Sequence, residues 1–488
     1  MIGKNAAMRR LLLLCLGSLA AACAVGPTYK KPQAEVPPAF KEPPPGDWKS
    51  AQPRDTALRG NWWEIFGDPQ LNALEEQVAA ANQTLAQAEA QFRAARAAVQ
   101  EVRAGLFPTV TAGASATVSR TSPSRAPVTS QASRSGTTTV YQVPVDVSWE
   151  ADIWGRVRRQ IEANVAAAQA SAADVAAVRL SLEAELAADY FQLHGLDEQR
   201  RLLDTTVADY EKALHITTLR HDQGVSSGAD VAEAQTQLET TRAQAIDLGV
   251  DRAALEHAIA ILTGKPPAGL TIAAAPIAVP PPVVPTELPS ELLERRPDVA
   301  AAERRVAAAN AQIGVAKAAY FPSLTLSGSG GFASSRLANL LSLPNRFWSL
   351  GAELAATIFD AGRRGAVAAQ AEASYDATVA AYRETVLTAF QGVEDNLAAL
   401  RILSEESTQQ ASAAAAAERS LNLARTRYSG GITSYLEVLT AENAALANQR
   451  ATVDVRIRQM IGRVNLVKAL GGGWSAAELS AERTAASR

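Results

Sequence analysis

The strongest constraint on the fold is a pair of stretches in which polar and apolar residues alternate. Most of the rest of the chain has the residue pattern of helices. Every second residue is apolar between 109 and 119, and the pattern returns between 141 and 150. A period of two is typical of a β-strand. A polar loop rich in Ser, Thr and Arg separates the stretches, and each is close to the roughly 9–11 residues that a tilted strand needs to cross a bilayer. The sequence therefore predicts a transmembrane β-hairpin with strands at about 107–119 and 139–150.

The residues around this hairpin predict long helices. Residues 71–103 are rich in Ala, Gln, Glu and Arg, with spaced apolar residues, and predict one helix of about 34 residues. Residues 156–223 contain no proline and predict a helix of roughly 100 Å, longer than a globular core needs and typical of coiled coil. A Gly- and Ser-rich break follows, and a return helix is predicted at about 229–264.

The same order of elements recurs in the second half of the chain. Gly155, Gly224 and Gly264 have counterparts at Gly362, Gly431 and Gly471, all at an offset of 207 positions. One shared offset indicates internal duplication. We therefore predict repeat 1 at 71–264, a Pro-rich linker at 265–289, repeat 2 at 290–471 and a C-terminal tail at 472–488. Within repeat 2 we expect strands at about 321–332 and 347–359, and helices at about 363–428 and 434–470.

The first 22 residues have the pattern of a signal peptide. Basic residues precede a short apolar run, and small residues lead to Cys23. This arrangement resembles a bacterial lipobox, which implies that Cys23 becomes the acylated N-terminus; the alternative is ordinary cleavage that leaves Cys23 as a free thiol. Residues 23–70 are Pro-rich and predict an extended, lipid-anchored segment, with Trp62, Trp63 and Phe66 as apolar anchors.

Four strands per chain cannot close a membrane barrel, because such barrels have at least about eight strands. Open strand edges are excluded from lipid, where each unpaired backbone group costs several kcal/mol. The chain must therefore oligomerise. Two copies would give a barrel filled by its own side chains, whereas three copies give twelve strands and leave a lumen. We predict a homotrimer with one shared β-barrel above a barrel of long helices.

Composition excludes several classes of function. The net charge of −3 gives no electrostatic footprint for nucleic acid, and no apolar run after the N-terminus is long enough for a membrane helix. The Gly-x-Ser-x-Gly spacing at 224–228 follows a predicted helix instead of a strand, so we expect no enzyme activity. The four histidines form no metal-ligand pattern, and we expect each on a helix surface and no metal or cofactor: His194, His215, His221 and His257.

Motifs along nearly the whole chain resemble those of the TolC-like outer-membrane efflux proteins, in the lipid-anchored NodT/OprM-type subgroup. The residues that carry the resemblance are Val25-Gly26-Pro27-Thr28-Tyr29-Lys30-Lys31-Pro32 after Cys23, Trp62-Trp63, Asp152-Ile153-Trp154-Gly155-Arg156, Arg295-Arg296-Pro297-Asp298-Val299, Ala319-Tyr320-Phe321-Pro322, Phe359-Asp360-Ala361-Gly362-Arg363, Arg427-Tyr428, Gly431 and Ser434-Tyr435-Leu436. The combination is highly specific.

The resemblance implies a trimeric channel of the cell outer membrane, with a 12-stranded β-barrel and a periplasmic α-helical barrel. It implies transport of small molecules such as drugs and toxic compounds. It also implies two partners: a periplasmic adaptor (membrane fusion) protein and an inner-membrane pump, often of the resistance-nodulation-division type. Two alternatives stay open, the exit duct of a type I protein-secretion system and a periplasmic coiled-coil adaptor without a pore. The two strand pairs weigh against the adaptor.

The resemblance also implies where the working residues lie. The two helix breaks would contact the adaptor at the far end from the lipid, and the candidate residues are Gly224, Val225, Ser227, Gly431, Ile432 and Ser434. A gate is implied just past the second break, where the candidates are Leu436, Glu437, Thr440 and Arg427. Leu436 and Thr440 share a helix face, and rings of leucine narrow pores by dewetting whereas acidic rings favour cations. Glu442 is a further acid that would act only if it faces the pore.

Overall fold

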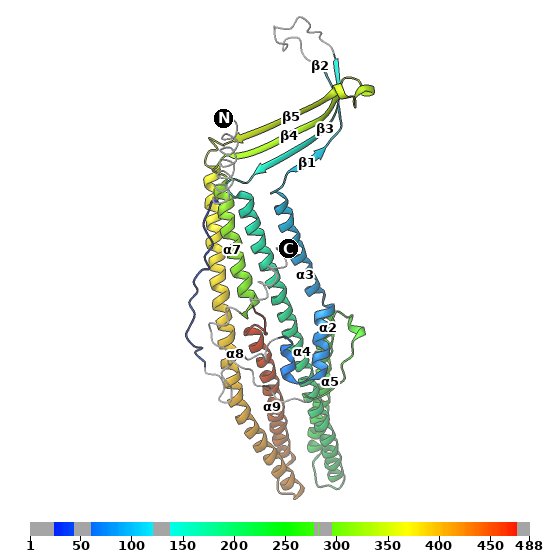
Figure 1. Cartoon of the computed structure of the whole chain (residues 1–488). Coiled ribbons are helices and arrows are strands. Elements are labelled where there is room, and N and C mark those ends of the chain that lie inside the picture. Colours follow the sequence, from blue (N-terminus) through cyan, green and yellow to red (C-terminus); the bar gives the residue numbers. More distant parts are fainter. Residues whose placement is uncertain (1–23, 43–59, 121–136, 278–281, 283–294, 476–488) are drawn as a thin grey trace. The chain divides into compact units, whose positions relative to one another are not determined.

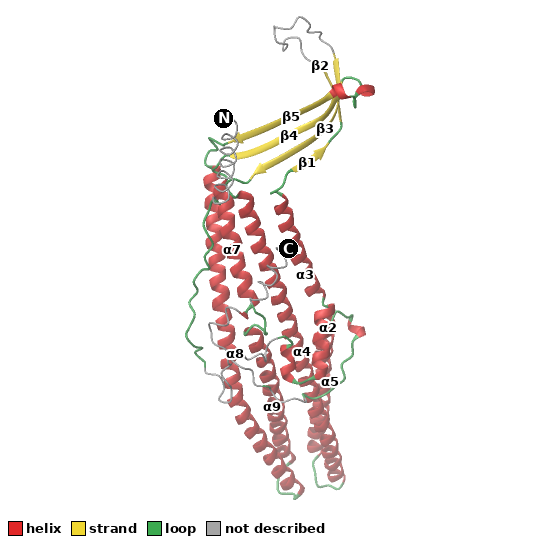
Figure 2. Cartoon of the chain, in the orientation of Figure 1, coloured by secondary structure: helices red, strands yellow, loops and turns green. Residues whose placement is uncertain are grey.

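The computed structural model describes residues 24–42, 60–120, 137–277, 282 and 295–475, in a mainly helical chain with one antiparallel sheet (Figures 1 and 2). Cys23 lies outside the described residues. Contacts divide the chain into two compact units, which are described separately. Unit 1 comprises Met1–Pro32, Arg93–Ala170 and Glu303–Ala381, and unit 2 comprises Gln33–Phe92, Ser171–Ala302 and Tyr382–Arg488. Each unit contains segments of both sequence repeats.

The sheet of unit 1 joins the hairpins of the two repeats. Its strands are β1 (Thr109–Ala112), β2 (Ser115–Arg120), β3 (Thr137–Ala151), β4 (Ser323–Ser334) and β5 (Arg346–Ala355). All pairs are antiparallel, in the order β1-β3-β4-β5, and β2 also pairs with β3. The central pairing, β3 with β4, runs from Tyr141↔Ser334 to Ala151↔Leu324 and connects repeat 1 to repeat 2. Large apolar side chains alternate along β5 and are exposed: Trp348, Leu350 and Leu354.

The first predicted strand is interrupted, and the prediction of one continuous strand at 107–119 was wrong. β1 and β2 are separated at Gly113, which lies opposite Pro144 of β3. The Gly113 amide donates to the Pro144 carbonyl oxygen at 3.0 Å, but proline has no N–H to return the second bond of the pair. On its other side Pro144 pairs with Gly331, where a Cβ would lie 2.1 Å from the Val143 carbonyl oxygen. Glycine is required there because the backbones approach so closely.

The helices fall into matched lengths. They are α2 (Pro69–Ala81), α3 (Gln83–Ala104), α4 (Arg156–Asp222), α5 (Gly228–Leu262), α7 (Pro297–Ala318), α8 (Arg363–Ser429) and α9 (Tyr435–Ala469), with short 3₁₀ turns η1 (Trp62–Phe66), η3 (Pro267–Gly269), η4 (Leu337–Asn339) and η5 (Leu343–Asn345). α4 and α8 each have 67 residues, and α5 and α9 each have 35, so the duplication extends to helix length. Among the described residues, none of the helices has the length and hydropathy needed to cross a membrane.

The single helix predicted at 71–103 is two helices, α2 and α3, which meet at Asn82. Asn82 has an extended backbone, with φ −67° and ψ 126°. Its Oδ1 accepts from the Leu85 amide at 3.0 Å, and its Nδ2 donates to the carbonyl oxygen of Leu262 at the end of α5, at 2.9 Å. Asn82 therefore starts α3 as an N-cap and ties the break to a second helix end. The helix-forming composition of 71–103 hid this role.

Unit 2 has an aromatic core near η1. Trp62 and Trp63 are buried and lie edge to face, with ring centroids 5.9 Å apart. Phe66 packs on Phe191 of α4 at 4.9 Å. The prediction that Trp62, Trp63 and Phe66 are apolar anchors is confirmed. They fix the start of α2 against α4.

Candidate functional site: the two helix turns

The turns that end α4 and α8, both in unit 2, have the same backbone design. In turn A (residues 223–227) the Gly224 amide donates to the carbonyl oxygen of His221 and the Val225 amide to the carbonyl oxygen of Arg220, both at 2.8 Å. In turn B (residues 430–434) the Gly431 amide donates to the carbonyl oxygen of Tyr428 at 3.0 Å, and the Ile432 amide to the carbonyl oxygen of Arg427 at 2.9 Å. These paired bonds are Schellman motifs. Gly224 and Gly431 both have φ +73°, in the left-handed region that glycine adopts without a steric penalty.

The helices that leave the two turns are capped differently. Ser227 caps α5, since its hydroxyl accepts from the Asp230 amide at 3.2 Å and the Asp230 carboxylate accepts from the Ser227 amide at 3.1 Å. Ser434 stands at the start of α9 without a side-chain cap. There the Thr433 hydroxyl donates to the Glu437 carboxylate, which also accepts from Arg427 at 2.7 Å. The start of α5 is therefore held by side chain to backbone bonds, and the start of α9 by side chain to side chain bonds.

Apolar side chains project from both turns. Val225 is 63% exposed, Ile432 is 72% exposed and Leu436 is 58% exposed. Exposed large apolar residues at two equivalent turns form a surface that favours contact with a partner. The turn glycines and serines shape this surface instead of contributing side chains to it. The assignment of this surface to an adaptor stays a prediction.

The four gate candidates lie together. Arg427, Leu436, Glu437 and Thr440 line one groove of about 600 Å³ between α8 and α9. The Thr440 hydroxyl donates to the Leu436 carbonyl oxygen at 2.8 Å, so this polar group is engaged with its own helix. Glu437 pairs with Arg427, which links the end of α8 to the start of α9. The groove thus combines the exposed side chain of Leu436 with the Glu437 carboxylate, whose charge is balanced by Arg427.

Glu442 does not face open space, so it cannot form the pore-facing acid considered from the sequence. It is only 2% exposed and accepts from the Arg425 guanidinium at 3.1 Å. Burial raises the pKa of the Glu442 carboxyl, and the bond from Arg425 opposes that rise. Glu442 lines a cavity of about 260 Å³ between the two hairpins, with Tyr428 and Tyr435 among the other lining residues.

The contact that joins the two hairpins involves residues that were not chosen from the sequence. Arg220 of α4 lies over the ring of Tyr428 of α8, and its guanidinium donates to the Tyr428 carbonyl oxygen. The Tyr428 hydroxyl is 3.3 Å from the Ser226 hydroxyl of turn A. The repeat offset could have revealed Arg220, because it is the counterpart of Arg427. The two arginines occupy equivalent positions but bind different partners.

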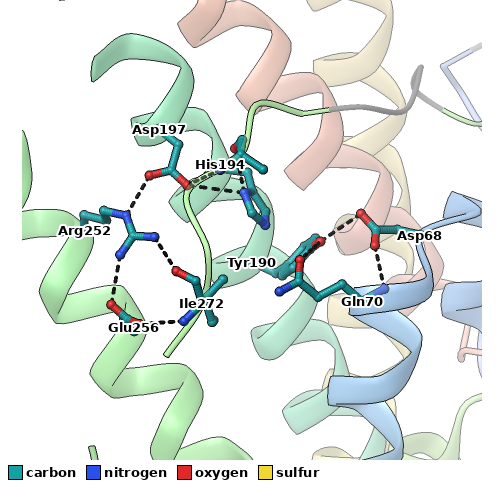
Figure 3. Close-up of polar contacts among 9 residues, drawn as sticks. Asp68, Gln70, Tyr190, His194, Asp197, Arg252, Glu256 and Ile272 are labelled. Atoms are coloured by element: carbon teal, nitrogen blue, oxygen red, sulfur yellow. Dashed lines mark hydrogen bonds and ion pairs between the residues drawn. The ribbon is translucent and has the colours of Figure 1, made fainter. Parts of the chain in front are cut away.

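His194 is buried, so the expectation that it lies on a helix surface was wrong. Only 3% of the residue is exposed. Its Nδ1 is 2.7 Å from the Ala275 carbonyl oxygen, and the Ala275 amide donates to Asp197 at 3.1 Å. Arg252 bridges Asp197, Glu256 and the Ile272 carbonyl oxygen, while Glu256 accepts from the Ile272 amide (Figure 3). Residues 270–277 make no ladder with another strand, so these side chains supply their backbone partners.

The segment that follows Cys23 is fixed to unit 1 beside the end of β3. The Val25 amide donates to the Trp154 carbonyl oxygen at 3.1 Å. Arg159 donates to the Val25 and Gly26 carbonyl oxygens at 3.1 and 3.2 Å. A Cβ on Gly26, which has φ +108°, would lie 2.4 Å from the Gly314 Cα of α7. Residue 24 is therefore held close to the strand end.

Comparisons with known proteins agree with these features. A family model described as outer membrane efflux protein matches residues 74–265 and 288–472. TtgF, the toluene efflux pump outer membrane protein of Pseudomonas putida, is 32% identical over 473 residues, covering 95% of this chain and 96% of TtgF. SilC, a probable outer membrane lipoprotein of Salmonella typhimurium, is 29% identical over 474 residues, covering 96% of this chain and 100% of SilC. The structure of the outer-membrane channel OprN matches with a TM-score of 0.84 and 33% identity, over 93% of this chain and 100% of OprN. The chain therefore belongs to the outer membrane efflux protein family.

Proposed function

We propose that three copies of this chain form one outer-membrane channel with a shared 12-stranded β-barrel. The observation that carries the proposal is the sheet of unit 1. Among the described strands its edges at β1/β2 and β5 are unpaired, and it exposes Trp348, Leu350 and Leu354. Apolar side chains can face lipid, but unpaired backbone groups cannot. The strand edges must therefore be paired if this sheet lies in a membrane. Pairing β5 of one copy with β1/β2 of the next satisfies every edge.

The channel would carry small molecules outward from a periplasmic adaptor and an inner-membrane pump. The efflux-pump name of TtgF supports this role for a chain of the same family. We assign the adaptor contact to turns A and B, because Val225 and Ile432 expose apolar side chains at equivalent positions. Gly224, Ser227, Gly431 and Ser434 would set the shape of that surface. The resistance-nodulation-division class is the proposed type of pump.

We assign the gate to the groove next to turn B. Leu436 would narrow the pore by dewetting, and Thr440 lies on the same helix face one turn later. The Arg427–Glu437 pair would hold turn B in register, and it leaves little free negative charge at this level. We therefore expect weak cation selectivity. No catalytic role is proposed for Ser226, whose Gly-x-Ser-x-Gly motif follows the helix α4 and not a strand.

The anchor would be Cys23, acylated after removal of residues 1–22. The bonds of Val25 and Gly26 beside Trp154 support this assignment, since they hold the start of the mature chain near the end of a membrane strand. The lipoprotein name of SilC supports it as well. Mass spectrometry of the mature N-terminus tests the modification directly, with Cys23→Ser as the control that accepts no thioether-linked lipid.

Two measurements test the channel proposal. Light scattering of the detergent-solubilised protein should give three times the 51.3 kDa of one chain, less the signal peptide. Cells that lack the gene should accumulate an apolar fluorescent dye, and the wild-type chain should reverse this. A stable monomer or dimer would contradict the shared barrel, and unchanged dye levels would contradict the efflux role.

A further inference from the structure

A buried carboxyl group in unit 2 has no hydrogen-bond partner among the residues that the structure describes. Glu75 lies on the apolar stripe of α2, together with Leu71, Leu74 and Val78. It is 0% exposed, and within the described part of the chain neither of its carboxyl oxygens has a hydrogen-bond partner. An ionised carboxylate in such a place costs several kcal/mol, so a buried unpaired group gives up its charge.

A second buried carboxyl group, Glu183 of α4, adds to the electrostatic cost. Glu183 is nearly buried, and its Oε2 accepts from the Trp62 indole N–H at 3.0 Å. The charge of Arg179, one turn earlier on α4, also acts on Glu183. The Arg179 side chain is half exposed and lies 3.9 Å from Glu89 of α3. The indole bond and Arg179 therefore favour the anion of Glu183, while burial and the approach of Glu75 oppose two negative charges.

The two groups differ in their expected protonation. Burial, and then the charge of Glu183, raises the pKa of Glu75 to about 10. Burial raises the pKa of Glu183 to about 7, against the bond from Trp62 and the charge of Arg179. Glu183 also lines a cavity of about 430 Å³ with Trp63, Arg179 and Trp474, through which water can reach it.

We propose that Glu75 and Glu183 form a proton-binding site that makes the attachment of α2 and the Trp62 turn to α4 depend on pH. The site binds protons in the folded chain that the unfolded chain has released. Both carboxyls have an ordinary pKa of 4.5, so the contribution of the site to folded stability is fully present below pH 4.5 and is lost as the pH rises through about 7 and then about 10. Alkaline conditions would loosen the contact of α2 with α4.

Infrared spectra of the full-length protein in D₂O test the site directly. The carboxylic acid C=O band should be present at pH 8, should be lost in Glu75→Gln and should remain in Glu76→Gln. Glu76 is the matched control because it is the next residue of α2 and is exposed. Absence of the band at pH 8 in the wild-type protein would show that Glu75 is ionised and would overturn the proposal.

Thermal unfolding provides a second test that does not depend on one spectral band. Glu75→Gln keeps the shape of a protonated carboxyl but has no proton to lose. Its unfolding midpoint should therefore exceed that of the wild type at pH 8 and match it below pH 4.5, where the unfolded wild-type chain is protonated too. Glu76→Gln should follow the wild-type profile. An unfolding midpoint of Glu75→Gln below that of the wild type at pH 8 would overturn the proposal. Glu75→Leu is the control for a packing defect at this position, because leucine needs no hydrogen bond.

The tryptophan signal reports on the other half of the site. The fluorescence difference between the wild type and Trp62→Phe isolates Trp62 among the 7 tryptophans of the chain. This difference should change as pH passes through about 7 and should become independent of pH in Glu183→Gln. A pH-independent difference in the wild type would count against titration of Glu183.

Discussion

The guanidinium of Arg220 lies 4.6 Å from the centroid of the Tyr428 ring and donates a 3.0 Å hydrogen bond to the Tyr428 carbonyl oxygen. Arg220 belongs to α4 and Tyr428 to α8, so this contact joins the hairpins of the two repeats next to their turns. The Tyr428 carbonyl oxygen also accepts from the Gly431 amide of turn B, so Arg220 adds a second hydrogen bond that comes from the other hairpin. The ring contact and the hydrogen bond together oppose separation of the hairpins.

Replacing Arg220 by alanine should weaken the contact between the hairpins by about 1–2 kcal/mol, the sum of an exposed cation–π contact and one hydrogen bond. If hairpin separation opens the channel, Arg220→Ala cells should admit a large hydrophilic antibiotic that wild-type cells exclude. Tyr428→Phe is the control, because it keeps the ring and the carbonyl and loses only the contact with Ser226. Equal exclusion by Arg220→Ala and the wild type would contradict a role in closure.

Gly431→Ala should destabilise turn B by about 1–2 kcal/mol, because its φ of +73° is unfavourable for any residue with a Cβ. Hydrogen exchange at residues 430–434 should become faster. Gly249→Ala is the matched control, since Gly249 lies inside α5 with no atom near a new Cβ, and it should stabilise the helix by about 0.5–1 kcal/mol. If hydrogen exchange at residues 430–434 is the same in both variants, the left-handed backbone of Gly431 does not stabilise the turn.

His194→Asn should preserve the clamp on residues 270–277, because the asparagine amide can replace the Nδ1 donor to Ala275. His194→Ala leaves the buried Ala275 carbonyl without this donor and should cost about 1–3 kcal/mol. The measurement is hydrogen-exchange protection of residues 270–277, which we expect in the order wild type, asparagine, alanine. Loss of protection in both variants to the same extent would show that imidazole packing, not the hydrogen bond, holds the segment.

Gly26→Ala should release the segment that follows Cys23 from unit 1. The substitution combines backbone strain at φ +108° with a clash against Gly314. Gly60→Ala separates the two effects, because Gly60 has φ +83° but no atom of the described residues lies within 4 Å of a new Cβ. Limited proteolysis between residues 24 and 31 should accelerate in Gly26→Ala only. Unchanged cleavage in Gly26→Ala would mean that the close approach of Gly26 to Gly314 does not hold the segment.

The sequence predicted the features that depend on local pattern. Strand alternation, the long proline-free helices and the glycine turns follow from periodicity and backbone freedom, and the structure has them close to their expected positions. The break at Asn82 was missed because its decisive contact is with Leu262, 180 residues away. The strand interruption at Gly113 depends on Pro144 of the neighbouring strand, and pairing across strands is not visible in one strand's pattern.

Burial of polar residues was the other limit. His194 and Glu75 occupy helix positions that composition alone assigns to a surface, yet both are buried by elements distant in sequence. For Glu75 the spacing to Leu71, Leu74 and Val78 placed it on the apolar stripe, so the signal was present in the helix period. The four gate candidates line one groove, and their role as a gate stays a prediction. The Arg427–Glu437 pair and the Arg220–Tyr428 contact were not predicted, because they depend on how the helices pack.

Single-channel recording of the purified protein in a planar bilayer tests most directly whether this chain forms a pore closed by its helix turns. We predict rare or small openings for the wild type, larger and longer openings for Arg220→Ala, and weak cation selectivity in both. Absence of any conductance in Arg220→Ala, from a preparation that is trimeric by light scattering, would contradict the account.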